Sequence, residues 1–145
     1  MRVIKLSVKK GKFDEKALDE ELKGLGNLEK IKEEAKKIAE DLKDVDFELK
    51  IFVEDDGSFY IEVETPPIAE LVKQKLGVDK LKPPEGQTIV GDLPFSFVEW
   101  LAEIKKYESL AKDKKARIKE ILGALSSMPL TVDGKLPKEL MSKSF

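Results

Sequence analysis

Two residue types that carry much of enzyme and metal chemistry are missing from this chain of 145 residues. It has no cysteine, which excludes disulfide bonds and thiolate metal sites, and no histidine, the commonest general base and metal ligand. Long apolar runs are also missing, so we predict no membrane-spanning segment. The first residues, MRVIKLSVKK, lack the apolar stretch and small-residue cleavage site of a secretory signal, which predicts a cytoplasmic protein.

Proline is absent from the first 65 residues and occurs seven times in the rest of the chain. The charge changes at the same place. Residues 1–65 carry 13 Lys and Arg against 18 Asp and Glu, a net charge of −5, whereas residues 66–145 carry 14 against 11, a net charge of +3. We therefore predict a boundary at ETPPIAE, with an N-terminal domain over residues 1–65 and a C-terminal domain over residues 66–145.

The hydrophobic pattern of the first part predicts a small sheet covered by helices. Alternating apolar residues predict a strand over RVIKLSV and a β-hairpin over FELKIFVEDDGSFYIEVE, with its turn at Asp56-Gly57. Between them, FDEKALDEELKGLG is a short helical candidate. NLEKIKEEAKKIAEDLK has the spacing of an amphipathic helix, with Asn27 at its N-cap. The expected order of elements is β-α-α-β-β.

The second part predicts a mostly helical domain behind a proline hinge. Thr65 precedes Pro66 and Pro67, so the strand must end there and a short stiff connector follows. Helices are expected over IAELVKQKLG, FSFVEWLAEIKK and residues 112–125, with a loop over residues 78–93 between the first two. LTV is expected to form a short strand and PKELM a last helical turn. The predicted fold class of the whole chain is α+β.

The acidic and aromatic clusters do not indicate a specific chemical site. Glu54, Asp55 and Asp56 do not fit the EF-hand pattern, and we interpret them as solvated turn residues without a metal ion. No glycine-rich phosphate loop follows a strand, and no carboxylate can be assigned to a cleft. We therefore expect no catalytic residue, no cofactor and no small-molecule substrate. Phe97 and Trp100 share helical spacing with nearby apolar residues and are interpreted as core side chains rather than a stacking surface.

The expected helix over residues 112–125 has two neighbouring faces. At 100° per residue, one face is apolar and consists of Ile118, Ile121, Leu122 and Leu125. The face beside it carries lysines and then small residues: Lys112, Lys115, Lys119, Gly123 and Ser126, with Ser127 adjacent. Two interpretations remain open. The face is either a solvated lysine surface at a fraying helix end, or a surface where small side chains let a folded RNA approach the backbone.

Three segments together resemble a ribosomal protein family. IEVETPPIAELVKQKLG, IVGDLPFSFVEWLAEIKK and ARIKEILGALSSMPLTVDGKLPKEL are similar, in order and spacing, to the large-subunit ribosomal protein eleven, the stalk-base protein of the ribosomal GTPase-associated centre. The resemblance covers residues 47–140, and TVDGKLPKEL is similar to the C-terminal extension of archaeal and eukaryotic-type members. It implies a β/α N-terminal domain, a proline hinge and a helical C-terminal domain that binds large-subunit rRNA.

The resemblance also implies which residues lie at the RNA. By position, the third C-terminal helix and the turn after it would contact rRNA through Lys112, Lys115, Lys119, Gly123, Ser126, Ser127 and Met128. The loop before the second helix would add Lys80, Lys82 and Gly91, and the hinge would be formed by Thr65, Pro66 and Pro67. The protein would be a cytoplasmic, ribosome-bound structural constituent without catalytic activity. Its further partners would be the ribosomal stalk proteins and, transiently, the translational GTPases.

The chain departs from the family pattern in both parts. Pro129 replaces the usual Gly after Ser-Met, Ala124 replaces the usual Thr after Gly123, and Glu64 replaces the usual Gly before the hinge. Family members have a Pro- and Gly-rich segment after the first strand, where this chain has the acidic and helical KGKFDEKALDEELKGLGNL. Two alternatives follow: a divergent paralogue or ribosome-associated regulator at the same rRNA site, and an interaction module whose acidic N-terminal domain binds a basic partner.

Overall fold

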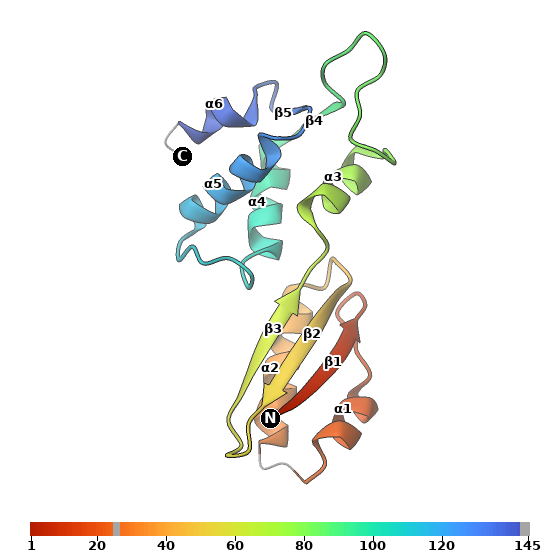
Figure 1. Cartoon of the computed structure of the whole chain (residues 1–145), viewed down its shortest axis with the longest axis vertical. Helices are drawn as coiled ribbons and strands as arrows, with labels where there is room; N and C mark the ends of the chain where they lie inside the picture. Colours follow the sequence, from red (N-terminus) through yellow and green to blue (C-terminus); the bar gives the residue numbers. More distant parts are fainter. Residues whose placement is uncertain (25–26, 143–145) are drawn as a thin grey trace. The chain divides into compact units, whose positions relative to one another are not determined.

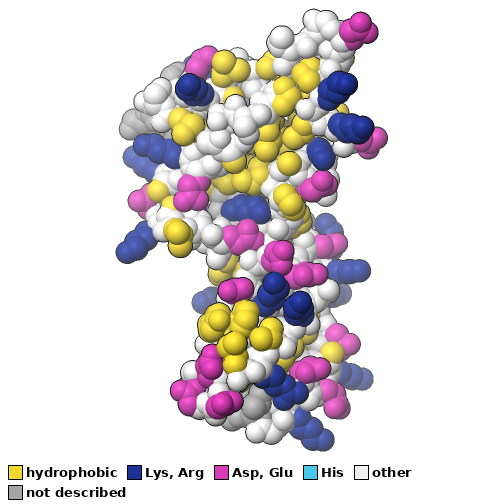
Figure 2. All heavy atoms as spheres, in the orientation of Figure 1, with side chains coloured by type: hydrophobic (Ala, Val, Ile, Leu, Met, Phe, Trp, Pro, Cys, Tyr) yellow, Lys and Arg dark blue, Asp and Glu magenta, His cyan; other side chains and the backbone are white. Residues whose placement is uncertain are grey.

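The chain folds into two compact units, Met1–Pro66 and Pro67–Phe145, each with its own buried core (Figure 1). The computed structural model describes residues 1–24 and 27–142. Both units contain helices and strands, as the predicted α+β class requires. On the face shown in Figure 2, side chains of both charge signs are interspersed on each unit. In the described ranges, no helix is long and apolar enough to cross a bilayer.

The first unit is a three-stranded antiparallel sheet with two helices against one face (Figure 1). Its elements follow the predicted order: β1 (Arg2–Val8), α1 (Glu15–Leu22), α2 (Leu28–Asp41), β2 (Phe47–Val53) and β3 (Phe59–Glu64). The central strand, β2, pairs with both β1 and β3. The hairpin turn between β2 and β3 contains Gly57, whose φ of 89° disfavours residues with a side chain.

Alternation along the strands places one face of the sheet in the core. Every second side chain of β1 from Ile4 to Val8 is buried, and the same holds for β2 from Phe47 to Val53. α1 and α2 cover this face with residues at helical spacing: Leu18, Leu22, Ile31, Ala35, Ile38 and Ala39. Each fully buried large aliphatic side chain stabilises the unit by about 1.5–3 kcal/mol relative to exposure. Neither helix of this unit covers the opposite face (Figure 1).

Side-chain hydrogen bonds position the starts of both helices. Asp14 caps α1, because its carboxylate accepts a hydrogen bond from the Ala17 backbone N–H at 3.1 Å. Asn27 stands at the N-cap position of α2, but its side chain makes no capping hydrogen bond. It donates instead to the carbonyl oxygen of Gly57 in the hairpin turn. The predicted N-cap position of Asn27 is therefore confirmed, and its side chain ties the start of α2 to the hairpin.

The second unit is mostly helical and contains a two-stranded parallel sheet. Its elements are α3 (Ile68–Leu76), β4 (Gly91–Leu93), α4 (Phe95–Ile104), α5 (Lys114–Leu125), β5 (Leu130–Val132) and α6 (Pro137–Met141). The predicted strand LTV and the final helical turn PKELM are confirmed. The predicted loop over residues 78–93 is wrong at its end, where β4 pairs with β5. Three residues are too few to give a period-two pattern.

The core of this unit contains the facing sides of α4 and α5. Val98 and Leu101 of α4 and Leu122 and Leu125 of α5 are fully buried. α5 packs against α4, and α6 also lies close to α5. The apolar face predicted for the third helix is therefore confirmed as a core face.

Phe97 and Trp100 are not in this core, so their predicted role as core side chains is wrong. Both are half-buried on α4, and their rings stack with centroids 5.3 Å apart. The Lys75 ammonium lies 5.7 Å from the centre of the Phe97 ring, within cation–π distance. Helical spacing alone could not separate a position in the core from one at its margin.

A carboxylate on β4 joins three segments of the second unit. Asp92 Oδ1 accepts hydrogen bonds from the Thr131 hydroxyl at 2.5 Å and from the Gly134 backbone N–H at 2.8 Å. Nearby, Asp133 accepts a hydrogen bond from the Phe95 backbone N–H at 3.2 Å, at the start of α4. The hydrogen bonds of Asp92, that from Thr131 first, hold the pKa of its carboxyl below the ordinary value.

We expect Asp92→Asn to destabilise the second unit at neutral pH and to reduce its sensitivity to acid. A carboxyl whose pKa is lowered by folding stabilises the folded state above its ordinary pKa of 3.8, and this contribution is lost as the pH falls through the lowered value. Because Asp92 is exposed and screened by solvent, we expect a cost of about 1 kcal/mol at neutral pH. Urea unfolding at neutral pH and near pH 3 measures both effects, with Asp79→Asn in the exposed loop as control. Equal acid sensitivity of wild type and Asp92→Asn would contradict this assignment.

Candidate nucleic-acid interface

α5 begins later than the sequence predicts. Asp113 is its N-cap, with extended backbone and a carboxylate that accepts a hydrogen bond from the Ala116 N–H at 2.8 Å. The predicted helix over residues 112–125 is therefore wrong at its first two positions, and Lys112 lies on the segment before the helix. An aspartate two residues into a lysine-rich run is the N-cap signal that could have placed this boundary.

Lys115 and Lys119 lie on an exposed side of α5, about one turn apart. A shallow surface hollow beside them is lined by Asp113, Lys114, Lys115, Ala116 and Lys119. Lys114 is held by α4, because its Nζ lies 3.1 Å from Glu99 Oε2. Within the residues that the structure describes, Lys115 and Lys119 form no ion pair, so their charges are available to an anion such as a phosphate.

The end of α5 is shaped by hydrogen bonds from two exposed serines. The Ser126 hydroxyl donates to the Gly123 carbonyl oxygen at 2.6 Å, and the Ser127 hydroxyl donates to the Ala124 carbonyl oxygen at 3.0 Å. Both bonds satisfy carbonyl groups that a helix leaves without partners in its last turn. The small polar residues therefore give the helix a defined end.

Both glycines predicted at the RNA have close neighbours within the fold. A Cβ atom added to Gly123 would lie 3.6 Å from Met141 Cε, so the end of α6 covers part of the surface predicted for rRNA. A Cβ atom added to Gly91 would lie 2.7 Å from Leu76 Cδ2, closer than two carbon atoms normally approach. Packing within the chain is thus one reason why both residues are small. Their contact with RNA stays a prediction.

The parallel sheet brings together the two segments predicted to contact RNA. Gly91 of β4 pairs with Leu130 of β5, and the Val90 backbone N–H donates to the Pro129 carbonyl oxygen at 2.7 Å. The end of the loop over residues 78–90 therefore lies beside the turn that follows α5. Sequence reasoning missed this junction.

The other predicted positions are distributed around this junction. Met128 is half-buried in the turn, and its backbone N–H donates to the Leu125 carbonyl oxygen at 2.9 Å. Lys80 and Lys82 are exposed on the loop, which extends away from α3 and β4 (Figure 1). Thr65, Pro66 and Pro67 form the connection between β3 and α3, with Thr65 buried.

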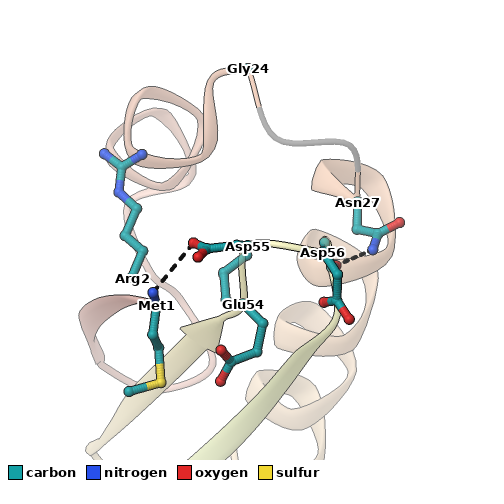
Figure 3. Close-up of a pocket in the computed structure, with 9 residues that line it drawn as sticks. Met1, Arg2, Gly24, Asn27, Glu54, Asp55 and Asp56 are labelled. Atoms are coloured by element: carbon teal, nitrogen blue, oxygen red, sulfur yellow. Dashed lines mark hydrogen bonds and ion pairs between the residues drawn. The ribbon is translucent and has the colours of Figure 1, made fainter.

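The three acids of the hairpin turn in the first unit do not converge on one point. Figure 3 shows the carboxylates of Glu54, Asp55 and Asp56 pointing in different directions around a surface pocket. Asp55 lies 3.4 Å from the Met1 ammonium group. Asp56 accepts hydrogen bonds from the hydroxyl and N–H of Ser58, which lower the pKa of its carboxyl. Over the described part of the chain, no three acidic side chains are arranged to hold a metal ion.

The chain is similar to archaeal ribosomal proteins. Residues 64–132, which contain the junction and α5, match the family described as Ribosomal protein L11, RNA binding domain. The Large ribosomal subunit protein uL11 of Archaeoglobus fulgidus is 38% identical over 114 residues, which cover 79% of this chain and 73% of that protein. The proteins of the same name from Thermococcus onnurineus and Methanopyrus kandleri are 36% and 35% identical, each over 81% of this chain, and over 73% and 71% of their own lengths. The chain therefore belongs to the family of the large ribosomal subunit protein uL11.

Proposed function

We propose that the second unit binds large-subunit rRNA at the GTPase-associated centre, the base of the ribosomal stalk. As a member of the uL11 family, the chain is a structural protein of the large ribosomal subunit, of archaeal type, and not an enzyme. The observation that carries the proposal is the junction of the turn after α5 with the end of the loop over residues 78–90. These two segments are adjacent there, and on α5 beside them Lys115 and Lys119 form no ion pair with any described residue.

The residues at this surface suit the chemistry of a folded RNA. Lys115 and Lys119 would contact phosphates, with Lys112 adding a third cation from the segment before α5. The hydroxyl oxygens of Ser126 and Ser127 still accept hydrogen bonds while they donate to the helix, so each can receive one from a ribose 2′-hydroxyl. Met128 and the loop lysines, Lys80 and Lys82, would complete the contact.

The first unit is proposed to serve protein partners. Residues 1–65 carry a net charge of −5, so this unit is repelled by phosphate groups. Its proposed partners are the ribosomal stalk proteins and, transiently, the translational GTPases. Thr65, Pro66 and Pro67 would act as a short hinge between the two roles, because proline restricts both its own backbone and that of the residue before it.

We expect a fragment of residues 66–145 to keep most of the affinity of the whole chain for the rRNA of this centre. All proposed RNA contacts lie in the second unit, which has its own core. Titration of the labelled rRNA with each protein at one salt concentration measures the two affinities, which should agree within roughly threefold. Circular dichroism shows whether the fragment is folded. A folded fragment that binds about a hundredfold more weakly than the whole chain would overturn the proposed division of roles.

A further inference from the structure

The first unit has a sheet face that neither of its helices covers. Three side chains from each strand point out of this open face and form three rows across the sheet. The open face consists of Val3, Lys5 and Ser7 on β1, Glu48, Lys50 and Phe52 on β2, and Tyr60, Glu62 and Glu64 on β3. In Figure 2 this unit shows an apolar patch bordered by charged side chains of both signs.

One end of the open face is an apolar row made of Val3, Phe52 and Tyr60. The register places Val3 opposite Phe52 and Phe52 opposite Tyr60. The two aromatic rings stack, with centroids 4.6 Å apart and 10° between their planes. Val3 is 46% exposed and Tyr60 is 49% exposed. Neighbouring large apolar side chains that remain in water are typical of an interaction site.

The other two rows hold three glutamates and two lysines, and two pairs of these charges face a like charge across the sheet. Lys5 lies directly opposite Lys50, and Glu48 lies directly opposite Glu64. Like charges at directly opposed positions destabilise an antiparallel pair. Lys50 also lies directly opposite Glu62 and forms a diagonal ion pair with Glu64 at 3.9 Å, and these opposite charges offset part of the repulsion. The two like-charge pairs, Lys5 with Lys50 and Glu48 with Glu64, are of the kind expected where a surface serves an external contact.

We propose that the open face binds an amphipathic segment of a protein partner. Apolar side chains of the partner would pack on the apolar row, and Arg or Lys side chains would pair with the acidic residues of the other rows, Glu48, Glu62 and Glu64. Phe52 and Glu48 are four residues apart on β2, a separation of about 13 Å. A helical partner would span this separation with about nine residues.

Nucleic acid is a poorer occupant of the same face. Because Phe52 and Tyr60 stack on each other, each ring has one π-face already in contact and offers less surface to a base. The three glutamates and the net charge of −5 over residues 1–65 repel phosphates. The proposal does not depend on rRNA binding by the second unit, so it is tested on the free full-length chain.

The test uses a designed helical peptide of about 14 residues, with leucines in one half and arginines in the other. We expect it to shift the backbone NMR signals of the open face on titration into the labelled full-length chain. A matched peptide with glutamate in place of arginine is expected to bind at least about tenfold more weakly. Equal binding of the two peptides, or signal changes confined to other surfaces, would overturn the proposal.

Two variants separate the apolar contribution from the charged one. Phe52→Thr with Tyr60→Thr keeps strand-forming residues on the open face and is expected to weaken peptide binding by about tenfold or more. Glu48→Gln removes the like-charge pair and keeps the Lys50–Glu64 ion pair, so it is expected to raise the urea midpoint of the chain while weakening peptide binding about threefold at low salt. This second variant keeps the test valid if the first does not fold.

Four outcomes of these measurements contradict the proposal. Two concern the variants: unchanged peptide affinity in the charge variant, and unchanged peptide affinity in a folded aromatic variant. The other two concern the occupant: a uridine oligonucleotide that binds this face more tightly than the arginine peptide does, and self-association of the free chain through the face. The last two would assign the face to nucleic acid or to a second copy of the chain.

Discussion

Replacing Lys112, Lys115 and Lys119 together with glutamine is expected to flatten the salt dependence of RNA binding. Each lysine at a phosphate releases about one counterion, which contributes roughly 0.7–0.9 to the slope of log K against log salt concentration. Loss of all three contacts therefore lowers the slope by roughly 2–3 units. All three lysines are exposed, so the free energy of unfolding should change by less than about 0.5 kcal/mol. Titrations over a salt series measure the slope, and thermal unfolding measures the stability.

Lys114→Gln is the matched control for this experiment. Lys114 is on the same helix next to Lys115, but its ammonium is already paired with Glu99 on α4. We expect this variant to leave the slope nearly unchanged and to lower stability by no more than about 1 kcal/mol. If the triple variant kept the wild-type slope, the lysines would be a solvated helix face and their assignment to phosphates would be wrong.

Gly123→Leu is expected to lower specific RNA affinity by about a hundredfold, or roughly 2.7 kcal/mol. A bulky side chain would stand where the proposed interface needs the RNA close to the helix backbone. Leucine favours a helix over glycine by up to about 1 kcal/mol, so the loss would not come from a weaker helix. Binding to the specific rRNA and to an unrelated RNA of equal length measures the effect, and the salt slope of the residual binding should change little.

The test of Gly123→Leu also needs a variant in which the neighbouring side chain of α6 is made smaller. Because Met141 of α6 lies against Gly123, a leucine there also disturbs α6. Gly123→Leu is therefore compared alone and together with Met141→Ala, which makes room for the new side chain. We expect specific binding to be lost in both backgrounds. If the double variant recovered specific RNA binding, Gly123 would be small because α6 packs against it. The proposed contact between Gly123 and RNA would then be wrong.

The element order of the first unit was predictable because each element repeats its apolar spacing. Burial alternates over all seven residues of β2 and over the last six of β1, and α2 keeps its apolar stripe over 14 residues. Such repeats are long enough to separate a period of two from a period of 3.6. The turn at Asp56-Gly57 adds a local signal that needs no knowledge of the rest of the chain.

The features that were missed depend on partners far away in the sequence. β4 has three residues and is stabilised by pairing with β5, whose residues lie 39 positions later. Asn27 has the residue type of an N-cap, yet its partner is Gly57, 30 positions away. The helical spacing of Phe97 and Trp100 is likewise compatible with a position in the core and with one at its margin. Short-range patterns carry no information on these choices.

The candidate site was predictable in part for the same reason. The lysines of α5 and the serines after it follow from helical spacing, and their exposure agrees with that pattern. The neighbours of Gly123 and Gly91 could not be predicted from helical spacing. A small residue indicates that another group lies close to the backbone, but it does not identify that group. The structure supplies Met141 and Leu76 as neighbours. The proposed RNA contact must therefore be tested against packing within the chain.

This chain is proposed to bind rRNA as a constituent of the large ribosomal subunit. The most direct test is to quantify it by mass spectrometry in large subunits purified from its own cells and washed in moderate salt. We expect one copy per subunit, equal to other large-subunit proteins and retained through the wash. A small fraction of one copy would favour a regulator that binds the same site only at times. Absence of the chain from the subunits, or its complete loss in moderate salt, would contradict the account.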